Sequence, residues 1–195
     1  MYNREEAIRF LKKHLDGWRV DHSIRVMELA RAMALQWGAD VENVEIAALL
    51  HDCGKWKDRE AALKKLESFG IIVDGELRYD YNLVHGILGS FLVQEVFGVY
   101  EKEVLDAIRY HITGRWDMGL IEKIVYLADK LEPARDYPGV EAIRKMAEKD
   151  LDKALLMVLD DTIMYLINHH HFIAPDSIEA RNFLLVEESA RDGSE

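Results

Sequence analysis

Apolar residues recur along most of the chain at intervals of three and four, which is the spacing of one face of an α-helix. In the clearest segment Val26, Leu29 and Met33 lie on one stripe, and Gly38 stands where the periodicity stops. Glycine is favoured just past a helix end because it adopts the left-handed conformation without steric cost. Asp40 is a residue type that caps the next helix. The pattern therefore predicts helices joined by short turns.

The same periodicity predicts helices along nearly the whole sequence. They are expected at residues 5–14, 20–37, 41–52, 59–69, 83–97, 101–111, 118–130, 140–147, 151–169 and 177–188. The short apolar stretch 71–75 ends in the turn signal Asp74-Gly75, and we interpret it as a loop. Because the sequence offers no series of strands from which to build a sheet, we expect an all-α helical bundle.

Composition narrows the class of protein. A chain of 195 residues with 49% hydrophobic residues suits one domain with its own core. The formal net charge of -11 argues against nucleic acid or an anionic membrane surface as a partner. If the substrate is a polyphosphate, the site must therefore be locally positive. We expect no membrane segment, because the sequence lacks an apolar run of about 18 residues.

Cysteine use and the start of the chain favour a cytoplasmic location. Cys53 is the single cysteine, so no internal disulfide is expected and a reducing compartment is suitable. Residues 1–10 are charged and amphipathic, without the apolar centre of a signal peptide.

Several histidines and two aspartates fall on the apolar faces of expected helices. These residues are His22, His51, His85, His111, Asp52 and Asp129. His22, for example, lies on the same stripe as Val26 and Met33. His14, which stands beside Lys13, is instead expected at the surface.

Two inward carboxylates among histidines point to a bound cation, because burying an unpaired carboxylate is very costly. Imidazole and carboxylate ligands without thiolate suit iron, manganese, cobalt, nickel or zinc. Taken singly, each residue has a simpler explanation. An inward histidine is more often a hydrogen-bonded core residue, Asp129 has Lys130 and Arg135 as neighbours to pair with, and Asp52 stands at a helix terminus. The joint pattern is what favours a metal centre.

The order of these residues resembles a known family. His22, then His51-Asp52, then a distant Asp129 is similar to the HD superfamily of helical metal-dependent phosphohydrolases. The stretch AALLHDCGK at residues 47–55 looks like that family's central motif. His85 and His111 resemble the subset that holds a second metal. The resemblance implies that residues 1–195 form a single HD domain, a helical bundle with its core at about 18–188 and a short polar C-terminal tail.

Three further stretches narrow the resemblance to the YqeK-type branch, the symmetrical bis(5'-nucleosyl)-tetraphosphatases. They are HITG at residues 111–114, YLADKLEPAR at 126–135 and ARN at 180–182. Together with the HD pattern the similarity runs from about His22 to Asn182. Ile112 departs from the branch, in which a second threonine is expected at this position.

The resemblance implies symmetrical cleavage of diadenosine tetraphosphate into two ADP. It implies a divalent metal, iron above all, held by His22, His51, Asp52 and Asp129. A second ion would be held by Asp52, His85 and His111, so one or two ions are expected. The nucleotide contacts that carry over are Lys130, Arg135, His170, His171, Phe172, Ile173, Ala174 and Pro175.

Residue chemistry adds roles to this set. Lys55, Lys130 and Arg135 are suited to meet the charge of the phosphates, and the Thr113 hydroxyl can donate to them. The residues expected to be catalytic are Asp52, Lys55, His85 and His111. Substrate contacts are also expected from His22, Asp52, His85, His111, Thr113 and Asp129. The expected partner is a small dinucleoside polyphosphate, and a homodimer is compatible with the sequence.

Five aromatic residues offer a surface for stacking a nucleobase, namely Trp18, Trp37, Trp56, Trp116 and Tyr126, although core packing is the default for aromatics at helical spacing. Trp56 and Trp116 each follow a motif closely and are the better candidates for the rim of the pocket.

Three other functions are compatible with the sequence. The chain is alternatively another HD-type nucleotide phosphohydrolase or phosphodiesterase, a nucleotide-binding sensor whose metal is structural, or a metal-free helical interaction protein. Product analysis distinguishes the first alternative, because symmetrical cleavage of diadenosine tetraphosphate gives two ADP and the other reactions give different products. A structural metal is normally fully ligated by protein, whereas a catalytic metal keeps an open position.

Overall fold

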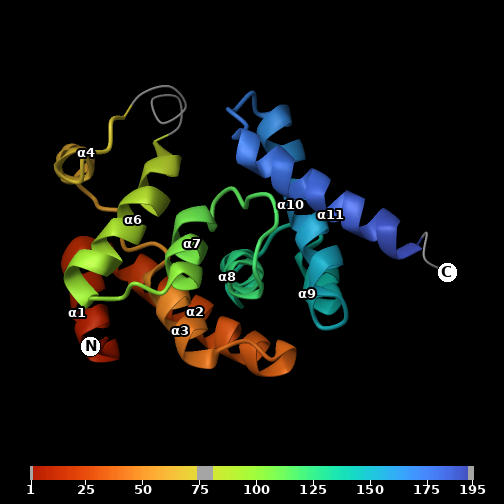
Figure 1. The fold of residues 1–195 in the computed structure, drawn as a ribbon, viewed down its shortest axis with the longest axis horizontal. Helices are drawn as coiled ribbons and strands as arrows, with labels where there is room; N and C mark the ends of the chain where they lie inside the picture. The colour runs from red at the N-terminus through yellow and green to blue at the C-terminus, as the bar shows by residue number, and fades with distance from the viewer. Residues whose placement is uncertain (1, 74–80, 193–195) are drawn as a thin grey trace.

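Helix α8 (Leu120–Leu131) lies at the centre of the molecule, and helices that precede it and helices that follow it in the chain pack against it (Figure 1). The structure is a computed structural model that describes residues 2–73 and 81–192. Helices α2, α3 and α7 contact α8 on one side, and α9 and α10 contact it on the other. The helix that carries Asp129 is therefore held from two directions.

The described residues form helices and contain no strand, which confirms the all-α prediction. Before α8 the helices are α1 (Arg4–His14), α2 (Gly17–Trp37), α3 (Val41–Leu50), α4 (Arg59–Ser68), α6 (Asn82–Phe97) and α7 (Lys102–Tyr110). After α8 come α9 (Val140–Ala147), α10 (Leu151–Asn168) and α11 (Pro175–Asp192). Within this part of the chain, none of the helices combines the length and the apolar character that a membrane crossing requires.

Several helices begin or end at residues other than the predicted ones. Helix α2 begins at Gly17 rather than at residue 20, because Asp16 is extended and stands at the N-cap. Helix α3 ends at Leu50, with His51 at its C-cap. Helix α11 runs from Pro175 to Asp192, beyond the predicted helix end at residue 188. The single-domain prediction stays a prediction.

Two predicted helix ends are confirmed by their caps. Gly38 has φ of 73° past the end of α2. The Asp40 carboxylate accepts from the Asn43 backbone N–H at 2.8 Å, at the start of α3. In the loop expected at 71–75, residues 71–73 have no regular structure, and Asp74 and Gly75 lie outside the described residues.

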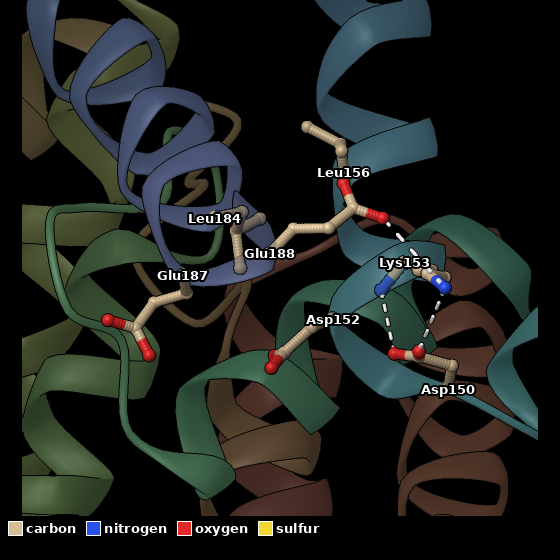
Figure 2. Close-up of a pocket in the computed structure, with 7 residues that line it drawn as sticks. All are labelled: Asp150, Asp152, Lys153, Leu156, Leu184, Glu187 and Glu188. Carbon is tan, nitrogen blue, oxygen red and sulfur yellow. Dashed lines mark hydrogen bonds and ion pairs between the residues drawn. The ribbon is translucent and has the colours of Figure 1, made fainter. Parts of the chain in front are cut away.

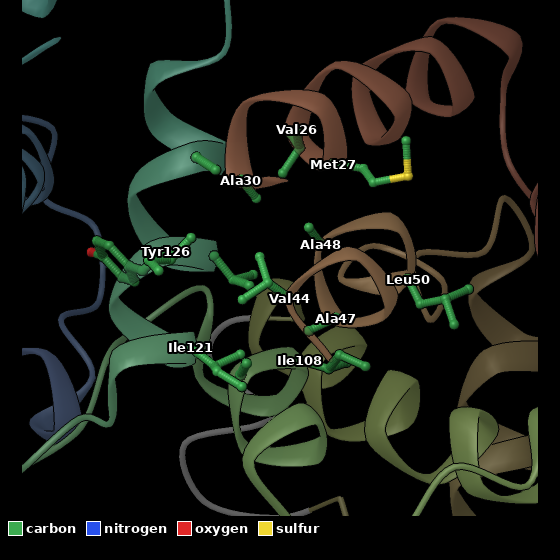
Figure 3. Close-up of a cluster of buried hydrophobic side chains, with 14 of the residues drawn as sticks. Val26, Met27, Ala30, Val44, Ala47, Ala48, Leu50, Ile108, Ile121 and Tyr126 are labelled. Atoms are coloured by element: carbon green, nitrogen blue, oxygen red, sulfur yellow. The ribbon is translucent and has the colours of Figure 1, made fainter. Parts of the chain in front are cut away.

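The hydrophobic core surrounds α3, which carries His51 and Asp52 at its end (Figure 3). Residues 46–50 are all buried, so this short helix is enclosed on nearly every side. Ala47 and Ala48 are small and let neighbouring helices approach closely, while Met27 of α2 and Ile108 of α7 fill the space around them. Burial of apolar surface, which contributes about 25 cal/mol per Å², thus holds α3 in place, and with it His51 and Asp52 at its end.

Gly54 allows the turn after Asp52 to touch the backbone of α6. A Cβ added at Gly54 would lie 2.3 Å from the His85 carbonyl oxygen and 2.7 Å from the Gly89 nitrogen. Both neighbours are backbone atoms of a packed helix, which cannot move aside as a flexible side chain can. The absence of a side chain at Gly54 therefore sets the distance between Asp52 and His85.

We predict that Gly54→Ala destabilises the protein by about 1–3 kcal/mol, the usual cost of overpacking. Thermal unfolding measures the change. Gly17→Ala is the matched control, because an added Cβ there meets no atom within 4 Å. Equal melting temperatures for the two variants would contradict this account of the turn.

Candidate metal centre

Six buried polar side chains from separate elements gather beside the hydrophobic core. His22 comes from α2, His51 and Asp52 from the end of α3, His85 from α6, His111 from the end of α7 and Asp129 from α8. None is more than 6% exposed. The predicted inward orientation of these residues is therefore confirmed.

His22, His51 and Asp129 form one group of potential ligands. The His22 Nε2 atom lies 2.9 Å from Asp129 Oδ1, and His51 Nε2 lies 3.8 Å from the same oxygen. One ligand atom from each residue lies within 4.8 Å of the other two. Ligand atoms about 2.0–2.2 Å from one ion lie roughly 3–4 Å apart, so the spacing suits a shared ion.

His51, Asp52 and His111 form a second group that meets the same distance limit. Asp52 Oδ1 lies 3.8 Å from His51 Nε2 and 3.6 Å from His111 Nε2. His85 joins this group, since its Nε2 is 3.1 Å from Asp52 Oδ1 and 3.0 Å from His111 Nε2. The structure thus brings together Asp52, His85 and His111, the second predicted set. Of the first predicted set it groups His22, His51 and Asp129, whereas Asp52 lies with His51 and His111. The binding of ions remains a prediction.

Backbone carbonyls fix which nitrogen two of these histidines turn toward the cluster. His51 Nδ1 donates to Ala48 O and His111 Nδ1 donates to Ile108 O, each at 2.7 Å. A carbonyl oxygen only accepts, so the proton is on Nδ1 and Nε2 of the neutral ring keeps its lone pair. His51 Nε2 is buried and makes no hydrogen bond within the described residues. A lone pair left in this position is what a metal ligand requires.

Both groups share His51, which has one nitrogen to offer because its Nδ1 is taken by Ala48. It can therefore bind only one of two neighbouring ions. Asp52 belongs to both predicted ligand sets, and a carboxylate has two oxygens to offer.

The charge states of the cluster also suit a metal. Burial lowers the pKa of His51 to about 4, so this ring is neutral near pH 7. Burial alone would raise the pKa of Asp52, but the surrounding imidazoles, with His85 Nε2 at 3.1 Å, hold it well below its ordinary value. Burial likewise opposes ionisation of Asp129, yet the positive charges of Lys130 and Arg135 keep that pKa well below its usual range. Neutral imidazoles and ionised carboxylates are the forms that bind metals.

Glu132 supports His22 from behind, and the sequence analysis missed this role. It is 2% exposed, and its Oε1 accepts from His22 Nδ1 at 3.1 Å. Its Oε2 accepts from Arg25 Nε at 2.6 Å and from the Ala134 N–H at 2.8 Å. Burial would raise the pKa of Glu132, but these hydrogen bonds, with Arg25 first, hold it at about 2. The carboxylate thereby keeps the His22 proton on Nδ1 and leaves Nε2 to face Asp129.

Arg144 holds the turn that follows α8. Its Nε donates to Leu131 O at 2.9 Å, and its Nη2 donates to Glu132 O at 2.8 Å and to Arg135 O at 2.9 Å. One guanidinium thus satisfies the carbonyls of the segment that carries both Glu132 and Arg135.

A cavity of about 390 Å³ lies against the cluster. It is lined by Trp18, Arg19, His22, Asp52, Lys55, Asn82, His85, His111, Ile112, Asp129, Lys130 and Arg135. The four Lys and Arg residues in this lining exceed its two aspartates, so the site is locally positive, as a polyphosphate substrate requires in an acidic protein.

The cationic side chains all lie close to the two aspartates. Lys130 Nζ is 2.6 Å from Asp129 Oδ2, and Arg135 Nη2 is 2.8 Å from Asp129 Oδ1. Lys55 Nζ is 3.8 Å from Asp52 Oδ1. These three were expected from the sequence. Arg19 was missed.

Arg19 lies 3.7 Å from Asp52 Oδ2, and a signal for it was present. It stands three residues before His22 on the same helix, and that spacing places both on one face. Glu132 likewise stands three residues from a predicted ligand, Asp129, at the C-cap of α8.

Other expected substrate residues lie apart from the cavity lining. The Thr113 hydroxyl donates to Gly114 O at 2.8 Å, and Thr113 does not line the cavity. The residues expected in the nucleotide loop are not part of that lining either; they are His170, His171, Phe172, Ile173, Ala174 and Pro175. Their contact with substrate remains a prediction.

The aromatic rim differs from the one expected. Trp56 packs on His14 with ring centroids 4.7 Å apart, and Trp116 packs on Phe183. Neither lines the cavity, whereas Trp18 does. His14 is half-buried in this stack, so the expectation of an ordinary surface residue was wrong.

A second hollow lies between α10 and α11 (Figure 2). It measures about 60 Å³ and is lined mainly by acidic residues. Its one cation, Lys153, lies 3.9 Å from Asp150 and 3.8 Å from Glu188. Its size and its charge make it unsuitable for a nucleotide.

Comparison with known proteins gives results that agree with this geometry. The family model described as "HD domain" matches residues 19–134. The chain is 40% identical to the "Bis(5'-nucleosyl)-tetraphosphatase, symmetrical" of Halalkalibacterium halodurans, over 95% of this chain and 99% of that one. It is 38% identical to the Bacillus subtilis protein of the same name, over 94% and 98% of the two chains.

A solved structure has the same fold. It is the crystal structure of a "predicted HD superfamily hydrolase involved in NAD metabolism" from Clostridium acetobutylicum. The TM-score is 0.91 at 38% identity, with 96% of this chain and 99% of that chain covered.

We predict that Glu132→Gln weakens metal binding by roughly 10- to 100-fold, the usual effect of losing a partner that orients a ligand. The amide keeps the size of the side chain but removes the charge that holds the His22 proton. Competition with a chelator of known affinity measures the change.

Glu122→Gln is the matched control. Glu122 is equally buried and accepts from an arginine, Arg115, and from the Gly119 N–H, but it lies outside the metal cluster. Equal metal affinity in the two variants would show that Glu132 has only a general role in stability.

Proposed function

The chain belongs to the HD-domain family and, within it, to the symmetrical bis(5'-nucleosyl)-tetraphosphatases, and on this basis we propose that it hydrolyses diadenosine tetraphosphate at its centre to give two ADP. The observation that carries the proposal is the meeting of buried histidines and aspartates with four cationic side chains around one cavity. The first set suits a metal, and the second suits the phosphates of a polyphosphate.

The residues proposed to hold the metal are His22, His51, Asp52 and Asp129, and their donor atoms fit it. His51 Nε2 is buried without a hydrogen bond, and both carboxylates are ionised. A bound divalent ion lowers the pKa of its water toward neutrality and polarises a phosphoryl oxygen. We propose iron, with manganese, cobalt, nickel and zinc as alternatives that suit the same nitrogen and oxygen donors.

Asp52, His85 and His111 are proposed to serve the reacting phosphates or to hold a second ion. His85 and Asp52 both line the cavity, and the 3.1 Å between them places an imidazole next to a carboxylate at the substrate side. There His85 is suited to donate a hydrogen bond to a phosphoryl oxygen, and His111 is suited to offer the lone pair of its Nε2 to a second ion. This arrangement supports catalytic roles for Asp52, His85 and His111.

Lys55, Lys130 and Arg135 are proposed to bind and orient the polyphosphate. Each has a cationic group in the lining of the cavity. Arg135 also donates through Nε to the Asp129 carbonyl oxygen at 2.9 Å, which fixes the guanidinium beside the metal cluster. A guanidinium held in this way suits bidentate contact with a phosphate. Burial lowers the pKa of Lys55, although Asp52 opposes the shift.

Further contacts are proposed outside the cavity lining. Thr113 follows Ile112, which lines the cavity, and the loop of residues 170–175 is proposed to reach the nucleoside. We also propose a cytoplasmic location, which the single buried, unpaired Cys53 supports. A homodimer remains a prediction from the sequence.

We predict that the purified enzyme converts diadenosine tetraphosphate to ADP alone when iron or manganese is supplied. Chromatography of the products is the measurement. Formation of AMP and ATP would contradict symmetrical cleavage, and so would release of phosphate from a mononucleotide as the faster reaction.

We predict that His51→Ala and Asp52→Ala lose both bound metal and turnover, since each removes a central donor atom. Elemental analysis and the ADP assay measure the two effects. His14→Ala is the control, because it removes a histidine outside the cluster and is expected to keep its metal. Near-normal turnover of Asp52→Ala would show that the active site has been assigned wrongly.

A further inference from the structure

We propose that Trp18 is a stacking platform for one nucleobase of the substrate and that Arg19 holds it in place. This inference rests on the proposed function, since it assigns a subsite of the same cavity. It concerns the nucleoside part of the substrate, for which the metal and the cationic residues provide no recognition.

Trp18 is exposed at the position where a nucleobase has to be recognised. Its side chain is 60% exposed, although tryptophan has one of the largest apolar surfaces among side chains. It lines the cavity together with His22 and Asp52. A large aromatic ring left open to solvent beside a polar cavity offers a flat apolar face on which a base can stack.

The other described residues that line the cavity do not offer such a surface. Apart from Trp18 and Ile112 they are charged, imidazole or amide side chains. Phosphates are bound by charge and hydrogen bonds, whereas a nucleobase is bound chiefly through its π-face. Of the described lining residues Trp18 is the one tryptophan, tyrosine or phenylalanine, so it alone supplies a large hydrocarbon ring.

Arg19 connects the indole ring to the metal cluster. Its guanidinium carbon lies 4.2 Å from the centroid of the Trp18 ring, which is cation–π contact. On its other side Nη1 lies 3.7 Å from Asp52 Oδ2. The guanidinium therefore spans the space between the ring and the cluster. In the substrate a ribose and one phosphate span the corresponding space between a base and the phosphates that flank the central bond.

The contact with Arg19 also prepares the ring for its ligand. The guanidinium lies over one face of the indole and restricts its rotation, while the exposed part of the ring stays available to a base. A ring that is already ordered loses less entropy when the base stacks on it. The base, the indole and the guanidinium would then form a three-layer stack at the mouth of the cavity.

The experiment compares a ligand that has a base with one that has none. The affinities of ADP and of inorganic pyrophosphate are measured by calorimetry on the metal-loaded full-length protein, for wild type, Trp18→Ala and Trp18→Phe. Trp116→Ala is the control, because Trp116 is an exposed tryptophan at 49% exposure that does not line the cavity.

We expect Trp18→Ala to weaken ADP binding by roughly tenfold or more, the effect of losing one stacked base. Pyrophosphate binding should be unchanged, and Trp18→Phe should recover most of the ADP affinity because it restores an aromatic face. With diadenosine tetraphosphate as substrate, Trp18→Ala should raise KM by a similar factor with a smaller change in kcat.

An unchanged ADP affinity in Trp18→Ala, or an equal loss for ADP and pyrophosphate, would overturn the proposal. Its failure is distinct from failure of the proposed function. A wild-type protein that does not cleave diadenosine tetraphosphate refutes the proposed function, while the two binding measurements still decide whether Trp18 recognises a base.

Discussion

Two carboxylates are buried among four histidines next to an apolar core, and this charge has to be compensated for the fold to be stable. An ionised carboxylate loses several kcal/mol of hydration when it leaves water, unless cations or hydrogen bonds replace that hydration. Asp129 contacts His22, Lys130 and Arg135, and Asp52 contacts His85. The protein thus concentrates cationic and neutral donors at one place despite its acidic composition. The same concentration of donors suits a metal ion and a polyphosphate.

The helical bundle makes this compensation precise. His51 and Asp52 follow the enclosed helix α3, and Asp129 belongs to α8, which is packed from both sides. Rigid elements hold ligands that are far apart in sequence within a fraction of an ångström of their positions. Glu132 and Arg144 add a layer of support behind the cluster, since one fixes the ring of His22 and the other fixes the turn after α8. Stability and function therefore depend on the same contacts.

Much of this organisation was predictable from local sequence rules, and the remainder depends on tertiary contacts. The apolar stripe that contains His22 indicated an inward side chain, which the structure confirms. The ends of α2 and α11 differ from the predicted ones, because a helix boundary is decided by backbone groups that periodicity does not report. Arg19 shares a helix face with His22, and Glu132 stands three residues after Asp129 at the C-cap of α8, so spacing alone was enough to suggest them. Trp18 could not be singled out among the aromatic candidates, since its exposure and its place beside the cavity arise from helices far apart in the chain.

The account depends most on one shared ion at the histidine–aspartate cluster, and anomalous X-ray diffraction tests this directly. Crystals of protein purified with its own metal would be measured on both sides of the absorption edge of that metal. The account predicts an anomalous peak within bonding distance of His22 Nε2, His51 Nε2 and a carboxylate oxygen of both Asp52 and Asp129. A peak located elsewhere, or one that these four side chains do not contact, would contradict it.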